Sequence, residues 1–135
     1  FGGMESRLAS SLYAIPAVKG LEFGDGFALA GMTGSQANDP FAMSNGRVVM
    51  TTNHAGGILG GITDGMPLIF RIALKPTPSI SLPQKSISLS NMENRELTVK
   101  GRHDPCIVPR AVPVVEAAAA IVLMDVLLGE GNFRP

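Results

Sequence analysis

The spacing of apolar residues predicts a helix near the start of the chain and a strand directly after it. Between residues 5 and 14 apolar side chains recur at the three- to four-residue interval of one helix face, and Pro16 ends the pattern. Residues 18–23 predict an extended segment. Gly24 and Gly26 follow it, and their freedom to adopt unusual backbone angles indicates a turn or a loop that a ligand approaches.

The middle of the chain predicts two further strands on either side of a glycine-rich loop. Residues 47–52 are rich in β-branched side chains, and residues 67–74 form a second apolar run. Before them, residues 33–45 are small, polar and rich in glycine and proline, which is typical of a loop or lid. We predict that residues 33–45 form a flexible loop.

The last third of the chain predicts a hairpin and then a long helix. Residues 86–89 and 96–100 alternate around a polar turn. Residues 112–128 are apolar almost throughout, with Pro113 in the first turn of the predicted helix and Gly129 just past its end.

Strands outnumber helices in this pattern, and the two alternate irregularly. We therefore expect the α+β class and a single domain over residues 1–135.

Composition and charge narrow the functional classes. The chain has 135 residues, of which 45% are hydrophobic, so a core can form. Eleven Lys and Arg residues balance eleven Asp and Glu residues, which removes the broad basic field of non-specific nucleic-acid binding. With no Trp and one Tyr, the chain has no platform on which bases stack. We expect no nucleic-acid partner.

The scarce residue types point to a reducing compartment and to no metal site. Cys106 is the single cysteine, which forbids an internal disulfide and favours a cytoplasmic location. His54 and His103 lack the spacing of a zinc site. Glu116 and Asp125 interrupt the most apolar stretch, leaving less than the ~20 uncharged residues that a bilayer requires. We expect no membrane span.

Residues 53–61, here called the glycine loop, contain two glycine pairs separated by two aliphatic residues. The loop matches neither G-x-G-x-x-G nor the complete Walker pattern, which needs a following Lys. Bare backbone can lie against a ligand, or it can permit a tight connection between strands. Both interpretations stay open.

A proline-rich segment places one cation and several hydroxyls on one side of the chain. In an extended backbone alternate side chains share a face, which aligns Lys75, Thr77, Ser79 and Ser81. An ammonium group with neutral donors suits a phosphate. Taken alone, the segment is more typical of a solvated edge or linker.

Charged residues gather again between Arg102 and Arg110, around Asp104. This density can tune a proton-transferring carboxylate or hold a charged substrate. Asp104 is otherwise a turn or capping residue, and Cys106 a small buried group. Glu116 either faces the two arginines or points to solvent; we favour a structural ion pair over a catalytic role.

The order of these segments resembles the C-terminal part of the chorismate synthase family. The similarity covers about residues 6–128 and thins in residues 34–45 and 90–95. The matching segments are 15–27 (IPAVKGLEFGDGF), 53–62 (NHAGGILGGI), 75–80 (KPTPSI), 102–106 (RHDPC) and 110–117 (RAVPVVEA).

The resemblance implies a β-α-β sandwich, assembled as a homotetramer, and a lyase of the shikimate pathway of aromatic amino acid biosynthesis. Its reaction is the anti 1,4-elimination of phosphate and a proton from 5-enolpyruvylshikimate 3-phosphate to give chorismate. The family requires reduced FMN although no net redox change occurs.

The resemblance also implies roles for individual residues. Arg102 would bind the substrate, and Asp104 would act as a catalytic residue that handles a proton near the flavin. The cofactor-binding residues would be Ala55, Gly56 and Gly57 against the isoalloxazine, and Lys75, Thr77 and Ser79 around the FMN phosphate.

One departure from the family is its length, because chorismate synthases are much longer than this chain. The family's catalytic histidines and most of its substrate-binding arginines lie in the N-terminal part, so we expect a fragment that is inactive alone and exposes apolar surface. The start at Phe1, without Met, agrees with a piece of something longer. Asp64 is a lesser departure, at a position where the family often has a small or amide residue. The alternative is a non-catalytic phosphate- or flavin-binding module, or an assembly module.

Overall fold

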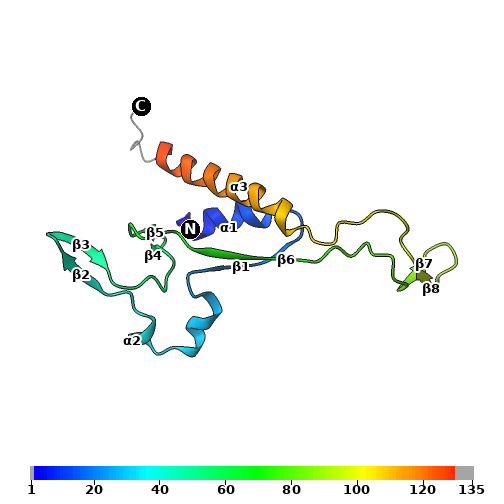
Figure 1. Ribbon diagram of the computed structural model, residues 1–135, viewed down its shortest axis with the longest axis horizontal. Coiled ribbons are helices and arrows are strands. Elements are labelled where there is room, and N and C mark those ends of the chain that lie inside the picture. The colour runs from blue at the N-terminus through cyan, green and yellow to red at the C-terminus, as the bar shows by residue number, and fades with distance from the viewer. Residues whose placement is uncertain (1, 130–135) are drawn as a thin grey trace.

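A two-stranded antiparallel ribbon lies at the centre of the computed structural model, which describes residues 2–129 (Figure 1). Strand β1 (Val18–Phe23) pairs with β6 (Phe70–Leu74), so residues 47 to 56 positions apart lie side by side. The register places Phe23 opposite Phe70 at one end of the ribbon and Val18 opposite Leu74 at the other. Both strands fall within the segments that the apolar pattern predicted.

Two helices cover one side of the ribbon, α1 (Met4–Tyr13) and α3 (Val108–Gly129) (Figure 1). The predicted helix over residues 5–14 is confirmed, and the side chains of Leu8 and Leu12 are the most deeply buried in the described chain. α3 packs on α1 and on the ribbon. The buried residues of the cluster between these helices and the ribbon are Met4, Leu8, Leu12, Ile58 and Ala119.

The predicted start of the last helix was wrong by four residues. The backbone N–H groups of Arg110 and Ala111 both donate to Ile107 O, so the first turn forms before residue 112. Pro113 therefore lies inside α3 rather than in its first turn, where the helix loses one backbone hydrogen bond. Gly129 is the last helical residue instead of the one after the helix.

α3 is apolar on nearly every side. Val115, Ala118 and Val122 face the core, whereas Val114, Ile121 and Leu128 on the opposite side are 50–68% exposed. By length and composition alone it qualifies as a membrane-crossing helix, with a mean hydropathy of 2.2, although its two acidic residues led us to expect otherwise. A core helix of a soluble protein meets the same criterion, and such a helix needs cover on both sides.

The segment predicted as a flexible loop contains secondary structure. After the short helices η1 (Gly26–Gly31) and α2 (Gly34–Ala37), strand β2 (Phe41–Ser44) pairs with β3 (Arg47–Met50) in a projecting hairpin. Its tip is Asn45-Gly46, with φ of 50° and 75°, the residue pair that two-residue hairpin turns prefer. This signal is present in the sequence and the prediction missed it.

A second hairpin lies at the end of a long arm that leaves the body near Leu74 (Figure 1). Strand β7 (Gln84–Ser88) pairs with β8 (Glu93–Leu97). The predicted hairpin is confirmed in kind, but its second strand begins at residue 93 instead of 96. All five residues of β8 are exposed, so no buried face fixes its position in the pattern.

A third, very short hairpin joins β4 (Ile58–Leu59), in the glycine loop, to β5 (Ile62–Thr63), directly after it. Helices and small antiparallel sheets thus mix, and the α+β class is confirmed. In the described residues the strands form four separate two-stranded sheets.

Candidate functional site

The glycine loop closes the Phe23–Phe70 end of the ribbon. The N–H of Gly24 donates to Ile69 O at 2.9 Å, and the N–H of Ile69 donates to Gly56 O at 3.1 Å. Gly56 has a φ of +73°, and a Cβ built on it would lie 2.4 Å from Gly24 N. Gly57 is equally enclosed, because its Cβ would lie 2.6 Å from Pro67 O. Close packing of backbone therefore accounts for both glycines.

Two carboxylates from other segments hold the dipeptide His54-Ala55 of this loop. Asp39 accepts hydrogen bonds from the N–H of His54 and the N–H of Ala55, both at 2.8 Å, and from Thr52 Oγ1 at 2.6 Å. Asp25 Oδ2 lies 2.6 Å from His54 Nδ1. Neither carboxylate was predicted as a site residue. Asp25 lies within the matching segment 15–27 but was singled out there only through its flanking glycines, and for Asp39 an aspartate within a polar loop was the only available signal.

Asp39 is the one charged residue that is fully buried among those described, with 6% of its surface exposed. Burial acts to raise the pKa of its carboxyl. The hydrogen bonds from Thr52, Ala55 and His54 act in the opposite direction and prevail, so the pKa lies below its ordinary value. Asp39 is therefore ionised at neutral pH and serves as a fixed acceptor.

Glu22 and Arg71 form a second charged contact beside the ribbon. Arg71 Nε donates to Glu22 Oε1 at 2.7 Å, and the N–H of Phe27 donates to Oε2 at 3.1 Å. The Phe27 N–H and the Arg71 guanidinium together lower the pKa of Glu22. This pair fastens η1 to the ribbon.

The residues predicted to hold a phosphate lie at the opposite end of the ribbon. The N–H of Lys75 donates to Ala17 O at 2.7 Å, which is the last backbone contact before the arm begins. The side chains of Lys75 and Ser79 are exposed. The hydroxyl oxygen of Thr77 is buried and has no hydrogen-bond partner. Because a buried hydroxyl normally has a partner, Thr77 is the one member of this set that the described chain leaves unsatisfied.

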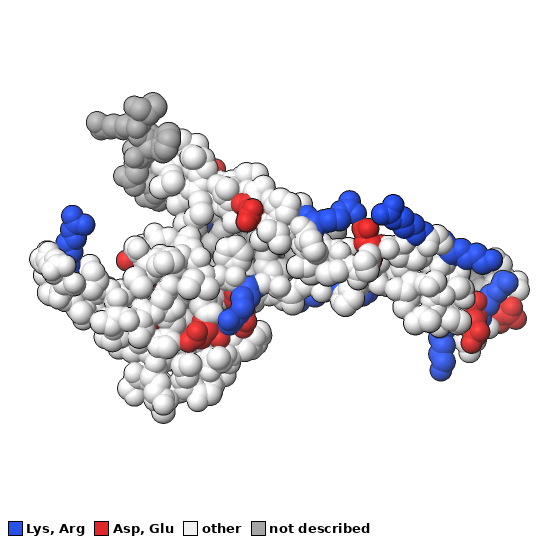
Figure 2. Space-filling view, viewed as in Figure 1, with Lys and Arg blue, Asp and Glu red and all other residues white. Residues whose placement is uncertain are grey.

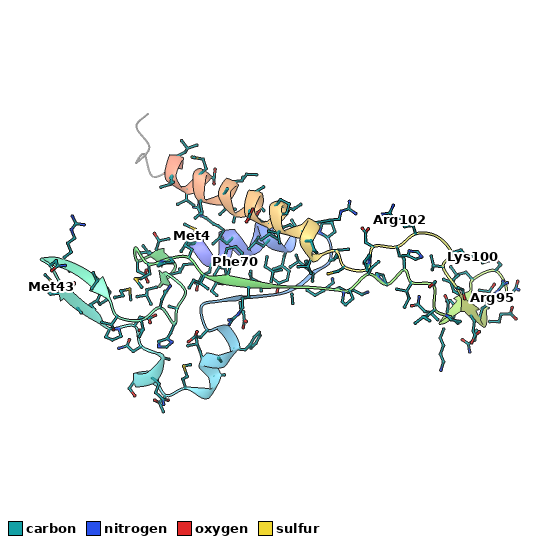
Figure 3. All side chains as sticks on the ribbon, in the orientation of Figure 1. Met4, Met43, Phe70, Arg95, Lys100 and Arg102 are labelled. Carbon is teal, nitrogen blue, oxygen red and sulfur yellow. The ribbon has the colours of Figure 1, made fainter. Side chains whose placement is uncertain are left out.

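Asp104 lies where the second strand of the arm returns to the body. Arg110 Nη1, in the first turn of α3, lies 2.5 Å from Asp104 Oδ2. Arg102 is exposed on the connecting segment (Figure 3). Glu116 is exposed and forms no ion pair within residues 2–129, so the predicted structural pair was wrong: Asp104 takes the guanidinium of Arg110 instead. Cys106 is exposed rather than buried.

Basic residues concentrate on the arm and its base. Six of the eleven Lys and Arg residues fall between positions 75 and 110, against three Asp and Glu residues. Figure 2 shows these side chains along the arm. A chain with no net charge thus has a local positive region that suits anions. Among residues 2–129 no cluster of His, Cys, Asp or Glu has the geometry of a metal site.

The structure separates the predicted site residues into two groups. Gly56 contacts Ile69, at the start of an extended stretch of chain. Lys75 lies six residues after Ile69, so Lys75 and Gly56 are about 20 Å apart at ~3.4 Å per residue. Arg102 and Asp104 lie on the segment that leads from the arm back to α3. Within one copy of the described chain, the glycine loop and the phosphate-binding candidates do not meet.

Comparison with known proteins identifies the family. Residues 1–128 match the family described as chorismate synthase. The chain belongs to the chorismate synthase family. The family resemblance seen in the sequence is therefore confirmed.

Curated chorismate synthases from several organisms are similar to most of this chain. The relative from Thermococcus gammatolerans is 61% identical over 125 residues, which are 93% of this chain and 35% of that protein. The relative from Archaeoglobus fulgidus is 54% identical over 131 residues, which are 97% of this chain and 36% of that protein. The relative from Methanosarcina mazei is 50% identical over 135 residues, which are 100% of this chain and 37% of that protein. The chain spans just over a third of the length of these relatives.

A solved structure described as a crystal structure of chorismate synthase has the same fold. Its TM-score is 0.72 at 35% sequence identity, covering 94% of this chain and 31% of the other. The α+β chain described here thus corresponds to a portion of a larger chorismate synthase fold.

Proposed function

We propose that this chain is part of a chorismate synthase, the lyase that eliminates phosphate and a proton from 5-enolpyruvylshikimate 3-phosphate in the presence of reduced FMN. The observation that carries the proposal is the family match over residues 1–128, with 61% identity to the Thermococcus gammatolerans relative. The local positive region supports it, because both FMN and the substrate carry phosphate.

The phosphate of FMN fits the residues that follow β6. Lys75 offers an exposed ammonium group, and Thr77 offers a buried hydroxyl without a partner. Ser79 lies two residues further along the same extended segment and adds a second hydroxyl donor. An anion here would satisfy the Thr77 hydroxyl, which is the feature of the structure that favours a ligand at this place.

The isoalloxazine ring would lie against the glycine loop at Ala55. Gly56 and Gly57 are enclosed by their own chain, so in this proposal they contribute a rigid shape and Ala55 supplies the contact. A reduced flavin held there would supply electron density for the elimination, while Ala55 would contact its ring. Because the two groups of residues lie about 20 Å apart, the rest of the full-length protein or a second subunit would complete the site.

Asp104 and Arg102 would act on the substrate side. The ion pair with Arg110 holds the Asp104 carboxylate at the base of the arm, with its side chain 44% exposed and accessible to a proton-bearing group. Arg102 is exposed on the same segment and forms no ion pair within residues 2–129, so its guanidinium is available to bind the substrate's negative charges.

The remaining elements of the proposal concern the whole protein. Because the chain spans just over a third of its relatives, further catalytic groups would come from the rest of the protein, and the isolated chain would be inactive. We propose a cytoplasmic homotetramer with a small-molecule substrate and without nucleic-acid or membrane partners. Assembly would cover the outer side of α3.

The test uses a hybrid enzyme, in which residues 1–128 replace the matching third of the Thermococcus gammatolerans chorismate synthase. With reduced FMN and 5-enolpyruvylshikimate 3-phosphate, the hybrid enzyme should form chorismate, which is followed by absorbance. The unmodified relative is the control. A hybrid enzyme that binds FMN without turnover would favour the alternative, a binding or assembly module. One that does neither would refute the proposed function.

A further inference from the structure

We propose that Asp39 is a positioning residue for the flavin-contacting part of the glycine loop. Its carboxylate would fix the backbone of His54-Ala55 in the conformation that faces the ring. This inference rests on the proposed function, because it takes Ala55 as the point of flavin contact. Asp39 itself would touch neither flavin nor substrate.

The geometry shows one buried carboxylate that receives two consecutive amides. Oδ1 accepts from the N–H of His54 and from Thr52 Oγ1, and Oδ2 accepts from the N–H of Ala55. Neither amide has a backbone acceptor within residues 2–129. Without Asp39 both N–H groups would lose their acceptor, and the contacts of Asp25 with His54, its N–H to His54 O at 2.9 Å and its Oδ2 to His54 Nδ1, would be left to hold the dipeptide.

The rest of the loop does not need this carboxylate to stay closed. Gly56 and Gly57 are held by close backbone contact with Gly24 and Pro67, and the following residues are held by the β4–β5 hairpin. Asp39 acts only on the two residues before that closure. Burying a carboxylate is costly unless all its oxygens are hydrogen-bonded. A buried and fully hydrogen-bonded carboxylate such as Asp39 is therefore expected where the backbone must keep one orientation.

A carboxylate is required here because all three neighbours are donors. An Asn at position 39 would present one oxygen and one NH₂ group, and the NH₂ would face an N–H or O–H that also donates. Asp39→Asn therefore removes at least one of the two amide contacts while it nearly preserves volume. Thr52→Val is a milder change that removes only a hydroxyl, which donates to the same carboxylate at 2.6 Å and more weakly to Asn38 O at 3.4 Å.

The experiment compares Asp39→Asn, Thr52→Val and Thr51→Val in the hybrid enzyme. Thr51 is the matched control, because its exposed hydroxyl donates to Pro40 O and not to Asp39. Four quantities are measured well below the melting temperature: the Kd for reduced FMN, the kcat and the KM for 5-enolpyruvylshikimate 3-phosphate, and the hydrogen-exchange rates of the His54 and Ala55 amides.

We expect Asp39→Asn to raise the FMN Kd by about tenfold or more, as for a lost charge-assisted hydrogen bond. Thr52→Val should raise it several-fold, and Thr51→Val should leave it unchanged. Exchange of the two amides should accelerate in the same order. The KM for the substrate should stay unchanged at saturating FMN, because Asp39 does not contact the substrate in this proposal. A merely structural role would lower the melting temperature and leave the FMN Kd unchanged.

The outcomes separate this inference from the function on which it rests. If the unsubstituted hybrid enzyme is active and Asp39→Asn keeps its FMN Kd while amide exchange accelerates, the positioning role is overturned and the proposed function stands. If Asp39→Asn does not fold, an unchanged FMN Kd in Thr52→Val overturns it equally. If the unsubstituted hybrid enzyme neither binds FMN nor turns over, both proposals fail.

Discussion

Replacing Gly56 by Ala should destabilise the chain far more than replacing Gly60 by Ala. Both glycines belong to the glycine loop and both have positive φ, +73° and +58°. They differ in their surroundings. A Cβ on Gly60 would meet nothing within 4 Å, whereas a Cβ on Gly56 would lie 2.4 Å from Gly24 N and 2.7 Å from Ile69 O.

The magnitude follows from these two contributions. Placing a non-glycine residue in the left-handed region costs about 1 kcal/mol, and this is all that Gly60→Ala should lose. Gly56→Ala incurs the same cost, and its Cβ must also push two backbone segments apart. Such overpacking costs about 1–3 kcal/mol, and breaking the hydrogen bond between Gly24 and Ile69 adds about 1 kcal/mol. The total is about 3–5 kcal/mol.

Urea denaturation followed by circular dichroism measures the difference, with both variants and the unsubstituted chain in the same hybrid enzyme. Equal m-values would show that the three proteins unfold from comparable states. We expect the free energy of unfolding of Gly56→Ala to lie at least 2 kcal/mol below that of Gly60→Ala, by the bookkeeping above. If the two variants are equally stable, the close backbone approach at Gly56 does not exist as described.

Four further predictions concern single side chains. Lys75→Ala should weaken FMN binding to the hybrid enzyme by about 1–3 kcal/mol, and an unchanged fluorescence titration would remove Lys75 from the site. Asp104→Asn should leave the FMN Kd nearly intact while kcat falls by about two orders of magnitude, and unaltered turnover would make Asp104 structural. Asp64→Asn should raise the free energy of unfolding by about 1 kcal/mol, because Asp64 Oδ2 is buried without a partner and a neutral amide is less costly to bury; thermal denaturation tests this. Because the pKa of Asp39 is lowered in the folded chain, its stabilising contribution is present above about pH 4 and is lost as the pH falls further; acid unfolding should be less steep in Asp39→Asn.

The elements that the sequence predicted best are those with a buried side. α1 and β1 lie where the apolar spacing placed them, because one side of each packs against the core. β8 is fully exposed, so nothing in the pattern determined where it begins. The first strand of the hairpin over residues 41–50 was not predicted, because residues 33–45 have the small and polar composition of a loop. Asn45-Gly46 nevertheless marked its turn.

The candidate site was predictable only as far as motifs reach. Lys75, Thr77 and Asp104 became candidates because they lie in short segments of distinctive composition, and their roles stay predictions. The contacts of Asp39 with Ala55 and of Asp25 with His54 join residues 16 and 29 positions apart, and alternation or spacing carries no information on such pairs. The ion pair of Asp104 with Arg110 replaced the one expected for Glu116, because the helix begins a turn earlier than its apolar stretch suggests.

The packing of α1 on α3 also sets the order of events when the chain is made. α1 ends at Tyr13, and its partner begins at Val108, so about 100 residues must be synthesised before α3 can complete the burial of Leu8 and Leu12. At 5–20 residues per second this delay is roughly 5–20 s. Closing a loop of that length costs about 4 kcal/mol of chain entropy. α1 therefore cannot complete its packing until α3 has been made. We expect slow folding, with a long-lived state in which the α3-facing side of α1 is uncovered.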